Sequence, residues 1–551
     1  MYDAMATKRG QLMEPYIGGK IKKVFAVFVL MILLYAIVNR DDIINRFQPG
    51  YMSVATIDTD ELETLLAGLK ETSDKPEISF NDHDLAYDQP GGLYYVTQNM
   101  KNDRWDGFFA SSRGKLYWKD DLYFTKCAAA LAEGHVFSLY CVDEAGGSYC
   151  SYPIVFTGMP MMVIKTETGA PIEDDAQDAV MWVSDMKFAG REYQSSDCEV
   201  NVRGQASKAY EKKGYKLELD RKLSLLGMRR DEDWILSALY DDDGLIHNKL
   251  SYDVWRNIAS DNTVAKDDGT TMEYVELFCN DEYMGVYGLT ERIDAKELSL
   301  DKSDILYKCS GFDMPDTTIP EDFGLSASYS VEWPKEYNSD TWVPLKNYLE
   351  LFDTEEITDY DAPRASLNME NAIDYNIFII LTRACDNYTR KNTFFVADYN
   401  NSGGGYSIIK VPWDCNATWG DGLYKGNINR QLYNPDWMYC AYVWSYDIKA
   451  MYQCYPDEIQ KLMLARWQEL RQDVLSEERL LGMLDEEFSY LHDSGAYDRN
   501  YVRWNEHGRE HWKDEYIYEY VSGRLAFLDT YFPDIYFDAQ AKGELEVPLE
   551  R

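Results

Sequence analysis

Asp386, Asn392 and Asp414 are the side chains of this sequence whose types and spacing fit metal-assisted phosphoryl transfer. Asp386 and Asn392 bound a polar loop that follows an apolar segment, and Asp414 follows a β-rich segment. Phosphoryl transfer needs one carboxylate to orient the attacking hydroxyl, and an amide and a second carboxylate to hold the metal ion at the nucleotide phosphates. The alternative is that the two aspartates only cap turns.

Two β-rich segments, 393–398 and 406–411, must bring these side chains together. The sequence NNSGGG between them is typical of a turn, so the segments should form a hairpin. If Tyr399 pairs with Tyr406, the register sets Asn392 opposite Trp413 and therefore beside Asp414. A slip of one residue would turn these side chains to the other face. The sequence thus predicts a site for a hard cation such as Mg²⁺ at the open end of a hairpin.

A candidate phosphate-binding segment precedes this hairpin. The stretch RGQAS at 203–207 is followed by Lys212, Lys213 and Lys216, in a chain that is otherwise acidic. Glycine lets the backbone approach a ligand closely, and arginine and lysine neutralise phosphate oxygens. A solvated loop and strand edge without a ligand would explain the same pattern.

The charge of the chain restricts its partners. It has 551 residues and a formal net charge of −40. Nucleic acid and anionic membrane surfaces repel such a protein, so we exclude them as its main partners. The charge fits a well-solvated surface, or alternatively basic or hydroxyl-rich protein substrates. The length predicts roughly two to four domains.

The ten cysteines include no CxxC pair and no Cys/His spacing of a zinc site. Cys141 and Cys150 bracket a Gly-Gly turn and form the best candidate for a local disulfide. Scattered buried thiols are the equal alternative.

An uninterrupted apolar run covers residues 24–38. As a helix these residues span about 22 Å, and Ile21, Lys22 and Lys23 extend it toward the ~30 Å of a bilayer core. Basic residues precede the run and acidic residues follow it, which predicts a cytoplasmic N-terminus and an external remainder. A cleaved signal peptide is the rival, but no clear small-x-small cleavage site follows the run.

The remaining chain divides into a stalk, a β-rich segment and a larger mixed region. Short strands separated by Gly-, Asp- and Asn-rich turns predict a small β-sandwich that serves as a spacer or accessory binding domain. We expect, in order, a cytoplasmic segment (1–20), a transmembrane helix (21–39), a stalk (40–74), the β-sandwich (75–158), a β-rich lobe (160–310), a helical lobe (311–535) and a tail (536–551).

Six segments, taken in their order along the chain, resemble the sequence motifs of a known protein family. They are RGQASKAYEKKGYKLEL, HNKLSYDVW, MGVYGLTERID, ILYK, IDYNIFIILTRACDNYTRKNTFF and VPWDCNATWG. Together they resemble the spore coat protein H (CotH) kinase family over about residues 160–535. The resemblance implies an α+β, two-lobed, atypical protein kinase domain that is secreted or surface-exposed. It also implies transfer of the γ-phosphoryl group of ATP to serine or threonine of extracellular proteins, with Mg²⁺ or Mn²⁺.

By motif position, the resemblance implies that Asp386 is the catalytic aspartate and Asp414 the metal-binding aspartate. We assign Asn392 to the metal from the hairpin geometry. Its six-residue distance from Asp386 is one longer than in protein kinases, and WDCNATWG replaces their DFG motif. The family's motifs also cover residues that we assign to nucleotide binding from their chemistry: Arg203, Lys216, Asn248, Glu291 and Lys308.

The segment after Arg203-Gly204 departs from the family pattern. The family usually has two hydroxyl residues there, whereas Gln205 and Ala206 precede the single hydroxyl of Ser207. We assign Ser207 to the nucleotide and expect weaker nucleotide binding if the lost hydroxyl contacts it.

Both proposed aspartates have a cysteine neighbour. If the two loops meet as the hairpin predicts, a disulfide between Cys385 and Cys415 would lock the site. The alternative is that the two side chains diverge.

These features predict a membrane-anchored, extracytoplasmic Ser/Thr kinase. A non-catalytic surface protein on the same fold, acting in adhesion or coat assembly, is the main alternative. A glycoside hydrolase would use Asp386 and Asp414 as its carboxylate pair, with some of the 14 tryptophans as sugar platforms.

Overall fold

The computed structural model describes residues 54–101, 105, 107–119, 127–185, 192–204, 206–311, 328–352, 357–388, 390–400, 405–420, 443–504 and 514–535. The chain forms two compact units. Unit 1 contains the described residues of 1–85, 101–127 and 137–154, and unit 2 contains those of 86–100, 128–136 and 155–551.

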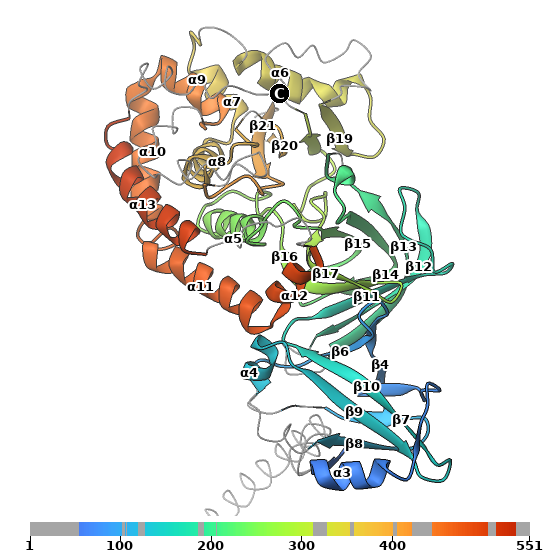
Figure 1. Ribbon diagram of the computed structural model, residues 1–551. Coiled ribbons are helices and arrows are strands. Elements are labelled where there is room, and N and C mark those ends of the chain that lie inside the picture. The colour runs from blue at the N-terminus through green and yellow to red at the C-terminus, as the bar shows by residue number, and fades with distance from the viewer. Residues whose placement is uncertain are drawn as a thin grey trace, which may run out of the picture. The chain divides into compact units, whose positions relative to one another are not determined.

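Unit 1 consists of two sheets and a helix (Figure 1). One sheet has the strands β1 (Ala55–Ile57), β8 (Lys115–Lys119), β9 (Val136–Asp143) and β10 (Ser148–Thr157) in that order, with β2 (Lys70–Glu71) paired to β10. The other has the order β4 (His83–Asp84), β3 (Ile78–Phe80), β7 (Phe109–Ser111). The ring of Phe109 packs edge-on against Trp118 at 5.6 Å, so the two sheets share a small aromatic core.

Residues 54–74 are part of this folded unit and not of the predicted stalk. Strand β1 pairs in parallel with β8. The helix α3 (Thr59–Leu66) is capped by the side chain of Asp58 and buries Leu62. The apolar side of helix α3 therefore packs against the core of unit 1.

The strands β5 (Ala86–Asp88) and β6 (Leu93–Thr97), which lie within the range 75–158 of the predicted β-sandwich, are part of unit 2. Tyr95 in β6 stacks on Tyr283 at 5.5 Å and meets Phe278 edge-on at 5.0 Å. This aromatic cluster attaches the hairpin β5–β6 to unit 2.

No helix in the described part of the chain is long and apolar enough to span a bilayer. The predicted transmembrane helix (21–39) lies outside the described residues, as do the predicted cytoplasmic segment (1–20) and tail (536–551).

Unit 2 contains a closed seven-stranded barrel (Figure 1). Its order is β11-β12-β13-β14-β15-β17-β16, and the parallel pairing of β11 with β16 closes it. The strands are β11 (Met161–Thr166), β12 (Gln177–Asp185), β13 (Glu192–Arg203), β14 (Gly214–Ser224), β15 (Arg230–Ser237), β16 (Met272–Cys279) and β17 (Glu282–Glu291). Strands β16 and β17 form a hairpin over Asn280 and Asp281, and both turn residues have positive φ, as type I′ turns require.

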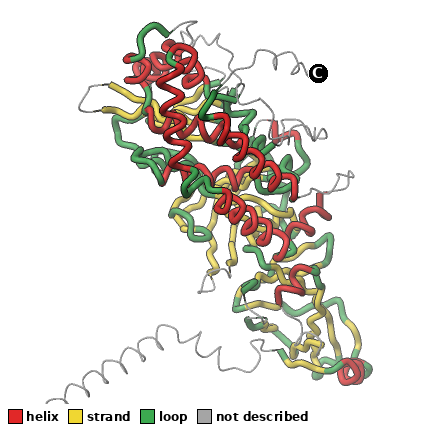
Figure 2. Tube along the Cα trace, turned by 90° about the vertical axis from the view of Figure 1, so that its left-hand side faces the viewer, coloured by secondary structure: helices red, strands yellow, loops and turns green. Residues whose placement is uncertain are grey.

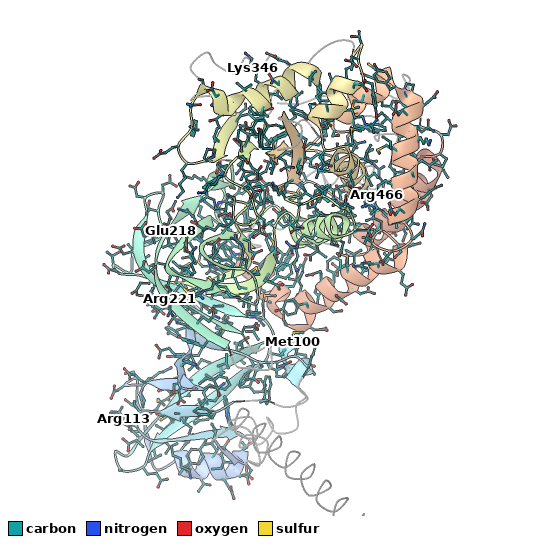
Figure 3. The ribbon with its side chains drawn as sticks, turned by 180° about the vertical axis from the view of Figure 1, so that it is seen from behind. Met100, Arg113, Glu218, Arg221, Lys346 and Arg466 are labelled. Carbon is teal, nitrogen blue, oxygen red and sulfur yellow. The ribbon has the colours of Figure 1, made fainter. Side chains whose placement is uncertain are left out.

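The alternation of β14 decides which of its side chains enter the barrel. Tyr215, Leu217 and Leu219 are buried in the barrel core. Lys216 and Glu218 lie between them and therefore face outward, and Figure 3 labels Glu218 on the outer side of the barrel.

A second sheet of unit 2 has the order β19-β18-β20-β21. Its strands are β18 (Ile305–Cys309), β19 (Tyr329–Trp333), β20 (Thr393–Asn400) and β21 (Gly405–Pro412). Strand β18 was predicted to belong to the β-rich lobe of 160–310, but it pairs with β20. Lys308 therefore lies on the same sheet as the hairpin of the predicted site.

Unit 2 also contains helices, some of which pack against this sheet. They are α5 (His247–Ser260), which precedes it in sequence, and α6 (Val343–Phe352), α7 (Asp361–Ser366), α8 (Met369–Thr382), α9 (Tyr446–Cys454), α10 (Pro456–Leu470), α11 (Glu477–Asp493), α12 (Ala496–Trp504) and α13 (Glu515–Tyr531). The short elements are α4 (Cys127–Ala132), η2 (Ala206–Ala209) and η3 (Ser339–Trp342). Helices α6, α7 and α8 pack against β21, and the longer C-terminal helices pack on one another (Figure 2).

Two hydrophobic cores hold unit 2 together. One fills the barrel, and the other joins α5, the second sheet and the C-terminal helices. The predicted mixed α+β class is confirmed. The helical half contains a four-stranded sheet, of which the sequence predicted the hairpin β20–β21.

Candidate active site

The open end of the hairpin β20–β21 brings two loops together. Tyr399 pairs with Tyr406, as predicted from the turn, and the backbone N–H of Trp413 donates to the carbonyl of Asn392 at 2.9 Å. The side-chain amide of Asn387 donates to the carbonyls of Asn392 (3.1 Å) and Trp413 (2.8 Å). A buried asparagine thus joins the loop 383–392 to the loop that follows β21.

The first loop begins where α8 ends. Arg383 has φ of 54° and caps the helix in the left-handed conformation. Cys385 N–H then donates to the carbonyl of Ala417 at 3.2 Å, and Trp419 N–H donates to the carbonyl of Thr382 at 2.6 Å. These bonds fix Asp386 close to the second loop.

The carboxylate of Asp386 is only slightly exposed and is held on two sides. Asn392 Nδ2 donates to Asp386 Oδ2 at 2.8 Å. Lys391 Nζ donates to Oδ1 at 2.9 Å and to Oδ2 at 2.6 Å. The orientation of the carboxylate is therefore fixed before any substrate binds.

Asp414 has a different environment, with a fixed backbone and an exposed side chain. Its φ is 53°, and its N–H donates to the hydroxyl of Tyr252 at 3.2 Å. Within the described part of the chain, its carboxylate accepts no hydrogen bond. Asp414 keeps solvent-accessible surface, but the protein atoms packed around its carboxyl displace part of the water and raise its pKa to about 6; the carboxylates of Asp241 and Asp386 add to the rise, and Arg203 and Lys308 oppose it.

Two cations lie on the indole ring of Trp413, the residue before Asp414. The guanidinium carbon of Arg203 is 5.9 Å from the ring centroid, and Lys308 Nζ is 5.7 Å from it. Lys308 Nζ is also 5.3 Å from the ring of Phe394. Desolvation lowers the pKa of both groups, and the nearby Arg203 lowers that of Lys308 further. Neither cation forms a hydrogen bond or ion pair with another described residue.

The structure thus gathers Asp386, Asn392, Asp414, Arg203 and Lys308 from the sequence-predicted set. Among the described residues, the carboxylate of Asp414 has no hydrogen-bond donor, and the two cations beside it contact rings but no anion; a metal-bound anion would complete this arrangement.

The lysines of the predicted phosphate-binding segment do not join this group. Lys216 faces outward from the barrel and forms an ion pair with Glu218 at 2.8 Å. Lys212 is buried and donates to Asn500 Oδ1 at 2.9 Å, and Lys213 donates to the carbonyl of Lys208 at 2.6 Å. These three ammonium groups have protein partners, so the basic cluster of the sequence is largely structural.

The structure places the other three predicted nucleotide-binding residues in different surroundings. Glu291 is buried and accepts from the N–H of Arg229 at 2.6 Å, which gives it a structural role at the end of β17. Asn248 Oδ1 accepts from the N–H of Cys415 at 2.7 Å, so this side chain contacts the loop that follows β21. The Oγ of Ser207 lies against Gly204, where an added Cβ would approach it to 2.0 Å. Gly204 has φ of +115°, so this turn needs glycine.

Four residues of the site were not identified from the sequence: Asn387, Lys391, Tyr252 and Asp241. Lys391 has a recognisable signal, because it lies between the predicted catalytic aspartate and the asparagine. Asp241, which accepts from Asn416 Nδ2 at 2.7 Å, and Tyr252 come from distant segments that only the tertiary fold brings here.

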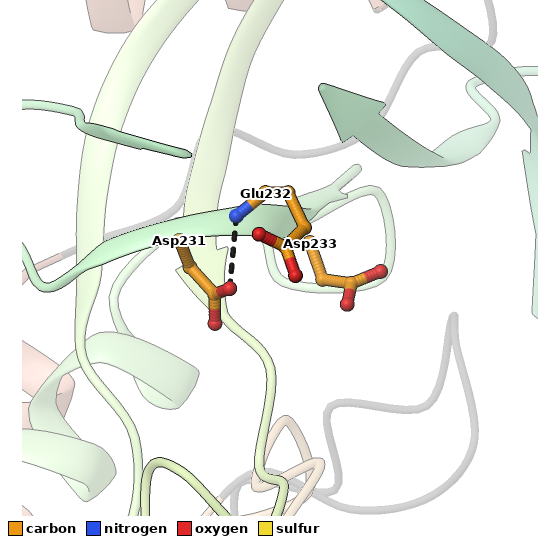
Figure 4. A group of neighbouring side chains, drawn as sticks. All are labelled: Asp231, Glu232 and Asp233. Carbon is orange, nitrogen blue, oxygen red and sulfur yellow. Dashed lines mark hydrogen bonds between the residues drawn. The ribbon is translucent and has the colours of Figure 1, made fainter. Parts of the chain in front are cut away.

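A second acidic group needs separate consideration. Among the described residues, the side chains of Asp231, Glu232 and Asp233 form the one set of three His, Cys, Asp or Glu residues with metal-ligand spacing (Figure 4). Cations already neutralise it: Lys296 Nζ lies 2.8 Å from Asp231 and 3.1 Å from Glu232, and Arg229 lies 2.7 Å from Asp231. This set is therefore an ion-pair network at the start of β15.

The predicted disulfides do not form in the described part of the chain. Cys141 and Cys150 are buried thiols. Cys385 Sγ is directed to the carbonyl of Arg383 at 3.2 Å, and Cys415 is a buried thiol. Several tryptophans are also fully buried, which removes them as sugar platforms: Trp234, Trp255, Trp419, Trp444 and Trp467.

Comparison with known proteins agrees with the geometry. A family model described as CotH kinase protein matches residues 200–528, more than half of the chain. A search of curated proteins finds no match. The matched region includes both hairpin-end loops, the helix α5, and the strand that contains Lys308. The chain therefore belongs to the CotH kinase protein family.

Proposed function

We propose that this chain is a protein kinase that transfers the γ-phosphoryl group of ATP to serine or threonine hydroxyls, with Mg²⁺ or Mn²⁺. The observation that supports this most is the exposed Asp414 beside the two cations on Trp413, where no residue described by the structure donates a hydrogen bond to the carboxylate or forms an ion pair with either cation. Asp386 lies in the adjoining loop, fixed by Asn392 and Lys391.

The oxygen atoms at this site fit a hard divalent cation. The carboxylate of Asp414 and Oδ1 of Asn392 accept no hydrogen bond from any described residue, and oxygen is the ligand atom that Mg²⁺ prefers. When bound, the ion would neutralise charge on the nucleotide phosphates. Arg203 and Lys308 would bind phosphate oxygens on the other side of Asp414.

Asp386 would orient the acceptor. Its carboxylate accepts the hydrogen of the serine or threonine hydroxyl, which directs the hydroxyl oxygen at the γ-phosphorus. The oxygen–phosphorus bond forms as the bond to the leaving ADP oxygen breaks, and the hydroxyl proton passes to Asp386. Lys391 remains next to this carboxylate, where it stabilises negative charge on the transferring group.

A phosphotransfer assay on the full chain tests this proposal. With [γ-³²P]ATP and a mixture of serine and threonine peptides, we expect labelling that needs Mg²⁺ or Mn²⁺ and is lost in Asp386→Asn. Asp529→Asn is the matched control, because Asp529 is also ion-paired, to Arg471 at 3.0 Å, but lies in α13. Full labelling by Asp386→Asn would refute the mechanism. Nucleotide binding without any transfer by the unaltered chain would support the non-catalytic surface protein instead.

We also propose that residues 21–39 anchor the chain in a membrane with residues 1–20 in the cytoplasm and the kinase region outside, facing surface or secreted proteins. The support is the basic sequence before the apolar run. Alkaline phosphatase, which is active only outside the cytoplasm, should be active when fused after residue 45. An inactive phosphatase in an expressed, membrane-bound fusion would reverse the orientation.

A further inference from the structure

One face of α5 contacts the loop that contains Asp414. Asn248, Ser251 and Tyr252 are spaced i, i+3 and i+4, so their side chains project from the same side of the helix. All three are buried. Each forms a hydrogen bond with a residue of the loop 414–419.

Tyr252 makes two contacts with this loop. Its hydroxyl accepts from the N–H of Asp414 at 3.2 Å, and its ring stacks on Trp413 with centroids 5.9 Å apart and planes 20° apart. Burial raises the pKa of the Tyr252 hydroxyl far above its usual value, so the group stays neutral at physiological pH.

Asn248 and Ser251 hold the next residues. Asn248 Oδ1 accepts from the N–H of Cys415 at 2.7 Å. Ser251 Oγ accepts from Trp419 Nε1 at 2.9 Å and lies 3.1 Å from Thr418 Oγ1. One helix therefore binds both ends of the loop, including two successive backbone N–H groups.

The backbone of Asp414 needs this support. Its φ of 53° is in the left-handed region, which is strained for residues with a Cβ; aspartate adopts it more readily than most side chains do, but at a cost relative to the right-handed region. Such a conformation persists where neighbouring groups fix it. Outside that conformation, the carboxylate would leave its place beside Trp413 and the two cations.

We infer that Tyr252 and Asn248 are positioning residues that hold Asp414 in its left-handed conformation and so present its carboxylate to the metal. The consequence for metal binding rests on the proposed function, whereas the positioning of Asp414 can be measured without metal or nucleotide. It replaces the assignment of Asn248 as a nucleotide ligand.

The first test is hydrogen–deuterium exchange on the full chain without ligands. Tyr252→Phe removes the acceptor of the Asp414 N–H and keeps the aromatic ring. We expect faster exchange in peptides covering 413–420. Tyr274→Phe is the matched control, because Tyr274 is also buried and its hydroxyl donates to the carbonyl of Leu245 at 2.7 Å, away from the loop. Equal exchange in the two variants at 413–420 would overturn the inference.

The second test is the affinity of the ATP complex for Mn²⁺, measured by electron paramagnetic resonance. Losing one buried hydrogen bond should weaken Mn²⁺ binding about 3- to 10-fold in Tyr252→Phe. Tyr274→Phe should bind as the unaltered chain does. Asn248→Ala should weaken binding similarly, and Asn248→Asp, which keeps the acceptor oxygen, should restore part of it.

The two tests separate the inference from the proposed function. If the unaltered chain binds no Mn²⁺ with ATP, the proposed function fails, whereas the exchange result still decides whether the loop is positioned by α5. If the unaltered chain binds Mn²⁺ and Tyr252→Phe binds it equally well, the inference fails alone.

Discussion

Lys308→Met distinguishes the nucleotide site seen in the structure from the one expected from basic residues in the sequence. The sequence indicated both Lys216 and Lys308 as nucleotide ligands. In the structure, Lys216 is ion-paired to Glu218 at 2.8 Å. Lys308 has no hydrogen-bonding partner among the described residues and lies over Trp413 at 5.7 Å.

The expected size of the effect follows from these environments. A hydrogen bond to a charged group contributes about 1.5–3 kcal/mol, which corresponds to roughly 10- to 150-fold in Kd. Removing Lys308 also relieves its repulsion with Arg203, so we expect the lower part of that range, about 10- to 30-fold. Lys216→Met breaks only an exposed ion pair, which contributes about 0–1 kcal/mol to the free energy of unfolding. This change should not affect the binding of phosphate.

Isothermal titration calorimetry with ATP and with adenosine provides the assay. Lys308→Met should weaken ATP binding by the stated factor and leave adenosine binding within about 2-fold, because adenosine has no phosphate for the lysine to bind. Lys216→Met should bind both ligands as the unaltered chain does. An equal loss of ATP affinity in the two variants would refute the reasoning, since it would place Lys216 at the phosphates.

Three other predictions concern the loops of the site. Since the pKa of Asp414 is raised to about 6 and a metal binds the carboxylate, Mn²⁺ affinity should be constant above pH 7 and fall about tenfold per unit below pH 6; a flat profile from pH 5 to 8 would contradict this. Lys391→Gln should lower kcat about 10- to 100-fold and change the ATP Kd less than about 3-fold, as separate kinetic and binding measurements would show. Asn387→Ala removes two buried hydrogen bonds, one within the loop 383–392 and one to the carbonyl of Trp413 in the second loop, so chemical denaturation should show a loss of about 2–3 kcal/mol of unfolding free energy; a loss under about 0.5 kcal/mol would mean the loops do not depend on this amide.

Local chemistry in the sequence predicted the centre of the site. The NNSGGG turn and the β-rich flanks determined the register of β20 and β21, and the register placed Asn392 opposite Trp413. This worked because a hairpin is set by its turn and by neighbours in sequence.

The contacts that depend on distant segments could not be predicted in the same way. Residue type suggested Lys216 and Glu291 as ligands, but only the barrel shows that one faces outward and the other binds the N–H of Arg229. Likewise, no local pattern shows that the helix containing Asn248 and Tyr252 packs against Asp414.

The folding of residues 54–74 into unit 1 also depends on pairing with a segment that is distant in the sequence. The segment is short and polar enough to resemble a stalk, and its strand β1 forms only because β8, about 60 residues later, supplies a parallel partner.

Mn²⁺ binding in the presence of ATP tests the central claim most directly, because it asks which carboxylates hold the metal. Electron paramagnetic resonance titrations should show Mn²⁺ bound to the unaltered chain with ATP, and this binding should be lost in Asp414→Asn. Asp233→Asn, a change in the ion-pair network at the start of β15, should leave it intact. Binding that survives in Asp414→Asn and disappears in Asp233→Asn would contradict the account.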